Sequence, residues 1–516
     1  MPSNIAFRWL SLVAVIWLQS VNGTNTNFPA YSSQLKHLLS LSQIQVNNLA
    51  FASDAAKLLG WLSGIAAVYL PLWLVLLIGS TLGLVGYGVQ YLFLTNQISS
   101  LSYAHIFCLT VLAGNSICWI NTVCYVVAIR NFPSNRQVAN GLTTSFQGLS
   151  AKIYTDIVDV AFNSSPTKRA QGYVLLNSVL PVIVSVICAS LAKDVGAEGI
   201  TDMKFGLFAM FIITIITGVY AILSSFKSIS RNILSPVGIL VGIYVLLLLP
   251  LVIPLIEKLI VEREKRVHVL DNNVSLEELE SGDKAEEEAR EVVKEEEVGV
   301  MEEIGVQVMV KRVNFWLYFF VYLLGVTLGL VFLNNLGQIA ESRHYQGTSY
   351  LVSLSSSFSF FGRLLPSLLD FCFSRSRYMI SRPASIVASM APMVIAFFLL
   401  LIKTNLALYI STAVIALCTG AITTLSVSTT TELFGAEKFS INHNIVIANI
   451  PIGSLLFGYS AALIYHKHAN GHGKCLGMEC YAQTFIVWGS LCFVGTLLAL
   501  ALYFRTRKFY STRVNR

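Results

Sequence analysis

Long apolar runs recur along this chain, separated by short polar segments. Each run has the roughly 20 residues that an α-helix needs to cross the hydrocarbon core of a bilayer. We therefore predict an all-α, polytopic membrane protein with about 14 transmembrane helices. The predicted helices span residues 7–31, 47–69, 71–94, 104–129, 139–162, 171–192, 205–226, 235–257, 313–337, 348–371, 384–402, 406–430, 441–466 and 482–504.

One segment, residues 258–312, breaks this pattern. It holds 16 of the 28 Asp and Glu residues of the chain and 9 of its 35 Lys and Arg residues. A segment so rich in charge cannot bury enough apolar surface to offset the entropy lost on ordering, so we predict a solvated linker. The predicted domains are residues 1–192 with six helices, 193–257 with two extra central helices, the acidic linker 258–312, and 313–516 with six more helices.

The composition excludes several classes of protein. Only 12% of the residues are charged, about half of the roughly 25% found in soluble globular proteins. The formal net charge of +7 does not indicate nucleic-acid binding, because the basic excess lies in short loops between apolar runs. The chain has no nucleotide-binding Gly-rich loop, zinc motif or Ser/His/Asp arrangement. We therefore expect neither an enzyme nor ATP-driven transport, and no metal or cofactor.

The distribution of basic residues predicts the orientation, because Lys and Arg favour cytosolic loops. With the N-terminus in the cytosol, most short basic loops face the cytosol. Those loops and the C-terminal tail contain Arg130, Arg136, Lys193, Lys204, Arg375, Arg377, Arg382, Arg505, Arg507 and Lys508, whereas Lys168, Arg169, Lys227 and Arg231 face outward. We expect both termini and the linker in the cytosol, in either the plasma membrane or an endomembrane.

The first residues and the outward loops leave alternatives open. Residues 1–23 combine Arg8, an apolar run and small residues, so they are either a cleaved signal peptide or part of the first transmembrane helix. Cys475 and Cys480 lie close together in an outward loop, where they form either a disulfide or two free thiols. Asn163 begins an Asn-Ser-Ser triplet that also faces outward, and it is a candidate for glycosylation.

Five charged residues form two groups inside two of the predicted transmembrane helices, where a charge is costly and needs a reason. They are Asp54 and Lys57 in the second predicted helix and Lys152, Asp156 and Asp159 in the fifth. At a rise of about 1.5 Å per residue, the two groups reach overlapping depths in the outer half of the bilayer. They could form one network that binds substrate or carries a proton. The alternative is a set of ion pairs that only lock helices together.

The first helix of each half turns polar at its outer end. The residues concerned are Asn22 and Asn25 in the first half and Asn334, Asn335 and Gln338 in the second. A long polar stretch should face a watery cavity rather than lipid, so we predict that these residues line a cavity. The alternative for the first half is that the helix ends at Val21 and a loop follows.

Five short motifs carry a resemblance to a known family. They are Arg130-Asn-Phe-Pro-Ser-Asn-Arg136, the pair Gly141-Leu and Gly148-Leu-Ser in the fifth predicted helix, Asn334-Asn-Leu-Gly-Gln338 and Phe361-Gly-Arg363. Together they resemble the plant nodulin-like branch of the major facilitator superfamily, which includes the nuclear-fusion-defective type of protein, and the resemblance covers nearly the whole chain. It implies two six-helix bundles that work by alternating access, here with two extra central helices.

The resemblance also suggests where a cytosolic gate would lie. We predict that Arg130 and Arg136 hold such a gate through contacts with helix ends or acidic groups; the alternative is that they only anchor their loop in the cytosol. Arg363 and Asp370 resemble the charged turn that this superfamily carries in its second half. The matching turn of the first half, residues 67–72, has no charge, which departs from the superfamily pattern.

These observations favour a secondary active transporter. We expect it to move a small polar solute or an organic anion by alternating access, coupled to protons, with the bilayer and the substrate as its partners. The alternative is a non-transporting membrane scaffold or regulator that docks a protein partner on its acidic linker. A cavity lined by polar residues from both halves would favour transport, whereas a collapsed interface with every charge internally paired would favour the scaffold.

Overall fold

The computed structural model describes residues 2–162, 164–195, 204–225, 235–259, 301–345, 347–373, 381–435, 437–469 and 475–514, and these residues form helices joined by short turns. The helices before the linker are α1 (Pro2–Val21), α2 (Phe28–Leu38), α3 (Gln43–Ala55), α4 (Gly60–Tyr69), α5 (Leu72–Leu94), α6 (Tyr103–Asn131), α7 (Arg136–Ala161), α8 (Pro166–Cys188), α9 (Lys204–Ser225) and α11 (Pro236–Leu248). Those after it are α14 (Val306–Met309), α15 (Val313–Tyr322), α16 (Leu328–Asn334), α17 (Leu336–Ser342), α18 (Thr348–Phe373), α19 (Arg382–Leu399), α20 (Asn405–Phe434), α21 (Phe439–Ile447), α22 (Asn449–Lys467) and α23 (Ala482–Val514).

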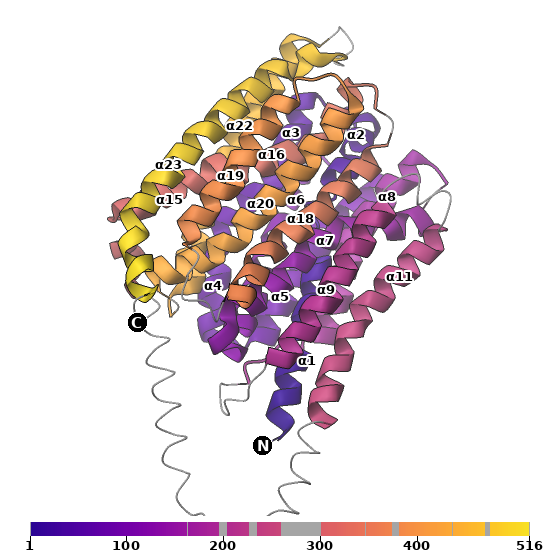
Figure 1. Cartoon of the computed structure of the whole chain (residues 1–516). Coiled ribbons are helices and arrows are strands. Elements are labelled where there is room, and N and C mark those ends of the chain that lie inside the picture. Colours follow the sequence, from indigo (N-terminus) through magenta and orange to yellow (C-terminus); the bar gives the residue numbers. More distant parts are fainter. Residues whose placement is uncertain are drawn as a thin grey trace, which may run out of the picture.

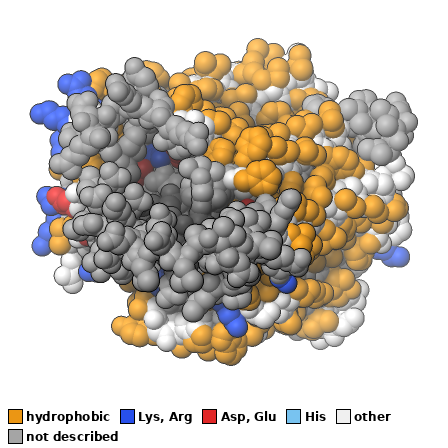
Figure 2. Space-filling model, turned by 60° about the horizontal axis from the view of Figure 1, so that its bottom comes forward, with side chains coloured by type: hydrophobic (Ala, Val, Ile, Leu, Met, Phe, Trp, Pro, Cys, Tyr) orange, Lys and Arg blue, Asp and Glu red, His pale blue; other side chains and the backbone are white. Residues whose placement is uncertain are grey.

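The long helices lie side by side in one bundle, and α1 begins at the same end of the bundle as α23 ends (Figure 1). In the described part of the chain, ten helices are long and apolar enough to cross a membrane. Large apolar side chains such as Ile183, Val186 and Leu255 point outward from them, and Figure 2 shows apolar side chains over much of the visible surface of the bundle. The chain is a multi-pass integral membrane protein.

The predicted number of about 14 transmembrane helices is not confirmed. The predicted helices 7–31, 47–69, 139–162 and 348–371 are not among the ten. Burial gives a physical reason for two of them, 139–162 and 348–371, which correspond to α7 and α18. In α7, for example, every residue from Val138 to Asp156 is buried, and α7 packs along α18. Helices that contact other helices rather than lipid need not be apolar all round.

The prediction of one continuous first helix over residues 7–31 is wrong. Helix α1 ends at Val21, residues 22–27 form non-helical turns, and α2 begins at Phe28. The polar side chains of the interruption have partners on neighbouring helices, because Asn22 Nδ2 donates to Asn121 Oδ1 over 2.9 Å and Asn27 Nδ2 to Asn177 Oδ1 over 2.7 Å. The alternative that the helix ends at Val21 is therefore correct, although the turns are buried inside the bundle rather than on its surface.

Two other predicted helices also change geometry along their length. The predicted helix 47–69 begins earlier, at Gln43, where Ser42 and Gln45 form a capping box, and a 3₁₀ turn at Ala56–Leu59 separates α3 from α4. The predicted helix 313–337 contains a π-helical segment at Leu323–Thr327 and is interrupted at Asn335. Such irregular segments are frequent at functional sites.

The two most extensive contacts between the part of the chain before the linker and the part after it are each made by one pair of helices. Helix α7 packs on α18, and α3 packs on α22. The two helices α9 and α11 contact α7, and α9 also contacts α18, where the hydroxyl oxygens of Ser225 and Ser357 lie 3.1 Å apart. The two extra helices therefore lie against the α7–α18 pair and not between the halves.

Candidate functional site

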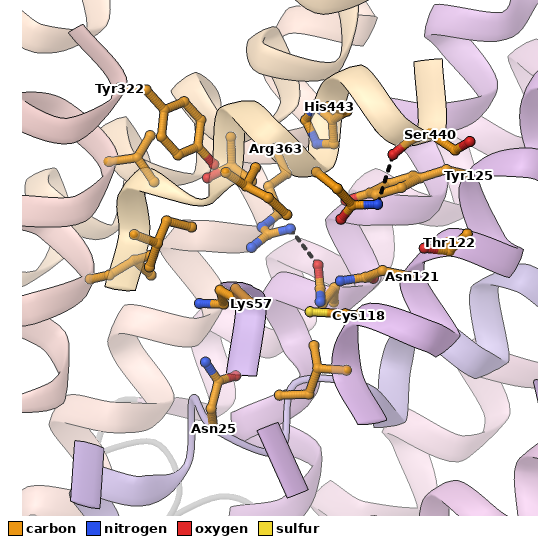
Figure 3. Close-up of a pocket in the computed structure, with 18 of the residues that line it drawn as sticks. Asn25, Lys57, Cys118, Asn121, Thr122, Tyr125, Tyr322, Arg363, Ser440 and His443 are labelled. Atoms are coloured by element: carbon orange, nitrogen blue, oxygen red, sulfur yellow. Dashed lines mark hydrogen bonds between the residues drawn. The ribbon is translucent and has the colours of Figure 1, made fainter. Parts of the chain in front are cut away.

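A central cavity lies between helices from both halves and contains about 910 Å³ of space not occupied by protein atoms. That space includes solvent open to the surface. Its first-half polar residues are Asn25, Thr26, Lys57, Asn121, Thr122, Tyr125 and Gln147, and its second-half polar residues are Tyr322, Arg363, Thr423, Ser440, His443 and Asn444. Figure 3 shows the labelled ones around one space: Asn25, Lys57, Asn121, Thr122 and Tyr125 from the first half, and Tyr322, Arg363, Ser440 and His443 from the second.

Arg363 is the charged residue that the second half presents to this cavity (Figure 3). The residue is only 9% exposed. Its Nη1 donates to Oε1 of Gln147 on α7 over 2.8 Å, which links the two halves through a neutral amide. Its Nε is buried without a hydrogen-bond partner. In the described part of the chain, no carboxylate forms an ion pair with Arg363.

Lys57 is the charged residue that the first half presents to the cavity, and it is paired with a carboxylate. Lys57 Nζ lies 2.6 Å from Asp54 Oδ1, three residues earlier in the chain. The other oxygen, Asp54 Oδ2, accepts hydrogen bonds from Ser454 Oγ over 2.7 Å and from Asn334 Nδ2 over 3.4 Å. We call Asp54, Lys57, Asn334 and Ser454 the Asp54 cluster. It joins a cavity-lining cation of the first half to α16 and α22 of the second.

Neutral hydrogen bonds extend this contact away from the cavity. Asn47 Nδ2 donates to Asn335 Oδ1 over 3.1 Å and to the carbonyl of Gly458 over 3.1 Å. Gln338 Nε2 donates to Ser32 Oγ over 3.0 Å. These bonds and the Asp54 cluster hold α2 and α3 against α16, α17 and α22. The two halves are thus held together next to Asp54 by hydrogen bonds between these helices.

A second small cavity lies on the far side of Asp54, with about 420 Å³ of space not occupied by protein atoms. Asn25 lines both cavities, and Asp54, Asn334 and Ser53 line the second. The Ser53 hydroxyl is buried there without a hydrogen-bond partner. Lys57 thus lines the central cavity and its partner Asp54 lines the smaller one, which borders residues of both halves.

The other predicted charges form separate pairs. Lys152 Nζ lies 2.6 Å from Asp156 Oδ1, and the two side chains are 2% and 7% exposed. Helix α7, which carries both residues, packs against the extra helices α9 and α11. Neither Lys152 nor Asp156 lines the two cavities described above. The geometry thus does not bring Asp54, Lys57, Lys152 and Asp156 into one network.

Asp159 lies one turn further along α7 and has a partner of its own. Asp159 Oδ1 lies 2.5 Å from Arg169 Nη2, with side chains 35% and 24% exposed. The same Arg169 nitrogen donates to Ser349 Oγ on α18 over 3.3 Å. This pair therefore joins α7, α8 and α18 near the surface of the bundle.

The α7–α18 contact is close along the helices. Ser356 Oγ donates to the carbonyl of Gly148 over 2.6 Å. A Cβ atom at Gly148 would lie 2.7 Å from the backbone nitrogen of Phe360, which is closer than real Cβ atoms approach. Glycine is therefore required here by the approach of the two helices.

A cluster of charges lies at the end of the bundle where α23 ends. Arg382 pairs with Glu432 over 3.1 Å and with Asp370, and it also donates to Gln137 Oε1. Gln137 Nε2 donates to Glu432 Oε1 over 2.8 Å. We call Arg382, Asp370, Glu432 and Gln137 the Arg382 cluster. Its charged residues all come from the second half, and Gln137 attaches the first half to them.

The end of the linker is attached to the same place. The backbone nitrogen of Met301 donates to the carbonyl of Glu432 over 2.7 Å, and that of Ile304 donates to the carbonyl of Phe434 over 3.3 Å. Tyr510 on α23 donates to Glu432 Oε2 over 2.9 Å. Residues from the linker end, α20 and α23 thus meet around one glutamate.

Comparisons with known proteins fit this architecture. Residues 8–255 match the nodulin-like family, and residues 297–512 match the C-terminal domain of NFD4. The chain is 39% identical to the protein NUCLEAR FUSION DEFECTIVE 4 of Arabidopsis thaliana, over 98% of this chain and 89% of that protein. The chain belongs to the nodulin-like family.

Solved structures show the fold of this nodulin-like protein. A proton-dependent oligopeptide transporter, solved in a study of substrate recognition, matches with a TM-score of 0.55 at 14% identity, over 99% of this chain and 100% of that one. The xylose transporter XylE of E. coli, in a partially occluded inward open conformation, matches with a TM-score of 0.52 at 12% identity, over 95% and 97%. The fold is therefore that of the major facilitator superfamily.

The predicted gate residues occupy different surroundings in the nodulin-like structure. Arg130 forms an exposed ion pair with Asp194 over 3.2 Å, within the first half. Arg136 begins α7, directly before Gln137 of the Arg382 cluster. Arg363 lines the central cavity, whereas Asp370 belongs to the Arg382 cluster.

The remaining predicted site residues are distributed as follows. Asn25 lines both cavities and Asn334 the smaller one, whereas Asn22, Asn335 and Gln338 hold neighbouring segments together through the hydrogen bonds given above. The sulfur atoms of Cys475 and Cys480 are joined in a disulfide. Asn163 lies outside the described residues. Among the described residues, no group of three or more His, Cys, Asp or Glu side chains could hold a metal ion.

Sequence reasoning missed three residues that connect the halves. Gln137 and Gln147 are neutral amides in a helix, and nothing in their spacing distinguishes them from other buried polar residues. Glu432 lies just beyond the predicted end of the helix 406–430, so it was not recognised as a charge inside the bundle. Its position directly after a run of three threonines, at the end of an otherwise uncharged helix, is the signal that could have identified it.

Proposed function

We propose that this nodulin-like protein is a secondary active transporter that moves a small polar solute or an organic anion by alternating access, coupled to protons. One observation carries the proposal: a cavity between the halves takes charged and polar side chains from both of them. A scaffold would need no such space. Arg363, which has no carboxylate partner in the described part of the chain, also argues against an interface in which every charge is internally paired.

The Asp54 cluster supports a mechanism for coupling. Asp54 is buried, neutralised by Lys57 and bonded to Ser454 of the second half. Opening the α3–α22 contact would expose the carboxylate to water, and closing it would bury the carboxylate again. We propose that proton exchange at this carboxylate is linked to the movement of the halves, because the contact that covers it joins α3 to α22. Protonation would weaken the pairing with Lys57 and free that ammonium for the cavity.

The proposal includes a topology. We propose about 14 transmembrane helices, with bundles formed by residues 1–192 and 313–516, two extra helices that come between them in the sequence, and both termini in the cytosol. We propose that residues 1–23 stay in the mature protein, and the burial of Trp9, Val13 and Ile16 of α1 supports this. A cysteine introduced into the linker should react with an impermeant reagent only from the cytosolic side. Reaction from the outside would overturn this orientation.

The experiment that tests transport is an uptake screen with the purified protein in lipid vesicles. A mixture of small metabolites is offered with and without a pH gradient, and the vesicle contents are compared with those of protein-free vesicles. We expect protein-dependent uptake of at least one polar solute or organic anion, increased by the gradient. Absence of protein-dependent uptake of any metabolite in either condition would contradict the proposal and favour a scaffold that docks a partner on its acidic linker.

A further inference from the structure

The charge balance of the central cavity indicates what kind of solute it would hold. Its lining contains two cationic side chains, Lys57 and Arg363, and neither Asp nor Glu. Lys57 is already compensated by Asp54, 2.6 Å away. Arg363 forms no ion pair with any residue of the described chain. The empty cavity therefore has one positive charge that no described protein group neutralises.

A buried, uncompensated guanidinium is costly, and the protein relieves little of that cost. Arg363 is 9% exposed, its Nη1 bonds to the neutral amide of Gln147, and its Nε has no partner. Taking a charge out of water is unfavourable unless a counter-charge meets it. The planar fork of an arginine matches a carboxylate in shape, and such hydrogen bonds are roughly twice as strong as those between neutral groups. The missing partner is therefore best supplied by an anion.

We propose that the solute is a small organic monoanion whose carboxylate is held by Arg363; this rests on the proposed transport function. With Asp54 ionised and paired with Lys57, 2.6 Å apart, one negative charge balances the cavity. A dianion would leave a buried negative charge, a cation would be repelled by Arg363, and a neutral solute would leave the guanidinium uncompensated.

The rest of the lining suits the body of such a molecule. The lining also contains apolar side chains, together with amides that can form hydrogen bonds with a hydroxyl or a carbonyl group. The apolar ones are Ile117, Val126, Val326, Leu330, Ile447 and Ile450, and the amides are Asn25, Asn121 and Asn444. Figure 3 shows Arg363 on one side of this space and Asn25 and Lys57 on another. The carboxylate would lie at Arg363 and the remainder of the molecule would extend toward Asn25.

The test compares acids with their own amides, which differ mainly in charge. The thermal stability of the purified, detergent-solubilised protein is measured with acetate, lactate, pyruvate, butyrate and benzoate, and with the five matching amides. Succinate, inorganic phosphate, chloride, glucose and choline serve as dianionic, inorganic, neutral and cationic probes. A ligand that binds the native state raises the melting temperature. We expect at least one monocarboxylate to raise it and the matching amide to have no effect.

Variants then locate the effect. Arg363→Gln should weaken the apparent affinity for that monocarboxylate about 10- to 100-fold, since a hydrogen-bonded charge is lost. Arg363→Lys keeps the charge but not the fork, so its affinity should lie between those of Arg363→Gln and wild type. Arg312→Gln is the matched control, because Arg312 is an exposed arginine paired with Glu302. It should bind like wild type.

The outcomes separate the inference from the proposed function. If amides, glucose or choline stabilise the protein and are exchanged by vesicles while the acids do neither, transport stands and the monoanion is wrong. The inference is also overturned if phosphate or succinate binds better than every monocarboxylate, or if Arg363→Gln binds the acid as wild type does. Should Arg363→Gln not fold, the acid and amide comparison on wild type, together with Arg363→Lys, decides the question. If wild-type vesicles exchange none of these solutes and the metabolite screen also finds none, the proposed function itself fails.

Discussion

Two buried ion pairs in this protein have almost the same sequence signature and different surroundings. Lys57–Asp54 and Lys152–Asp156 each join residues one helical turn apart, and in each the ammonium lies 2.6 Å from a carboxylate oxygen. The first borders the central cavity, and its carboxylate is bonded to the second half through Ser454. The second is enclosed beside the extra helices and borders neither cavity.

The difference shows how far spacing alone can define a role. Spacing of three or four residues on a helix predicts that a lysine and an aspartate will meet. Whether the pair can act as a switch depends on what else bonds to the carboxylate. Asp54 has a partner that must leave when the halves separate, whereas the described partner of Asp156 lies on its own helix. We therefore expect the first pair to serve coupling and the second to serve stability.

Breaking the enclosed pair should have the largest effect on stability. Lys152→Met leaves Asp156 as an unpaired buried carboxylate, which should lower the free energy of unfolding by about 3–5 kcal/mol. The double change Lys152→Met with Asp156→Leu removes both charges and should restore most of it, because replacing a buried ion pair by apolar residues is often neutral or stabilising. Thermal denaturation and abundance of the two variants check this. A stable single variant, or a double variant as unstable as the single one, would contradict the assignment.

Removing the cross-half partner of Asp54 should have a smaller effect, directed at conformation. Ser454→Ala deletes a hydrogen bond to a carboxylate, which is worth about 1.5–3 kcal/mol. The contact between α3 and α22 should open about tenfold more often or more. Hydrogen exchange of peptides from α3 and α22 measures this opening.

The control for this variant is on the same helix. Ser460 donates to the carbonyl of Phe457 within α22, so Ser460→Ala should leave exchange in α3 unchanged. Equal exchange in the Ser454→Ala and Ser460→Ala variants would mean that the Asp54 cluster does not hold the halves together.

An exposed ion pair should have the smallest effect. Arg130 and Asp194 have side chains 49% and 41% exposed, and surface pairs contribute about 0–1 kcal/mol. Arg130→Lys should therefore change stability by less than about 0.5 kcal/mol and leave transport unchanged. Loss of transport in this variant would revive the prediction that Arg130 holds a gate, and would show that exposure is a poor guide in this protein.

Much of the fold was predictable from the apolar pattern. Where the predicted helices differ from the structure, the difference has a physical cause. Every predicted transmembrane segment contains a helix of the structure. The first helix was extended too far because Asn22 and Asn27 were read as a polar helix surface, while both amides bond to other helices and allow the backbone to turn. Such partners are distant in sequence, so no local pattern reveals them.

The candidate site was predictable only in part, for the same reason. Charged residues inside apolar helices pointed to Asp54 and Lys57, and the structure places Lys57 at the cavity. The grouping of Asp54 with Asp156 rested on depth alone, and depth does not say which way a side chain faces around its helix. Gln137 and Gln147 carry the contacts between the halves through neutral amides, which have no signature in a single sequence.

The central claim is that Asp54, and not Asp156, couples protons to the movement of the halves. The measurement is transport by purified protein in vesicles, using a solute identified in the uptake screen, in two modes: accumulation driven by a pH gradient, and exchange without a gradient. Asp54→Asn should lose accumulation and keep exchange, whereas Lys152→Met with Asp156→Leu should keep both. If Asp54→Asn still accumulates the solute, or if the folded double variant exchanges but no longer accumulates, the coupling role assigned to Asp54 is wrong.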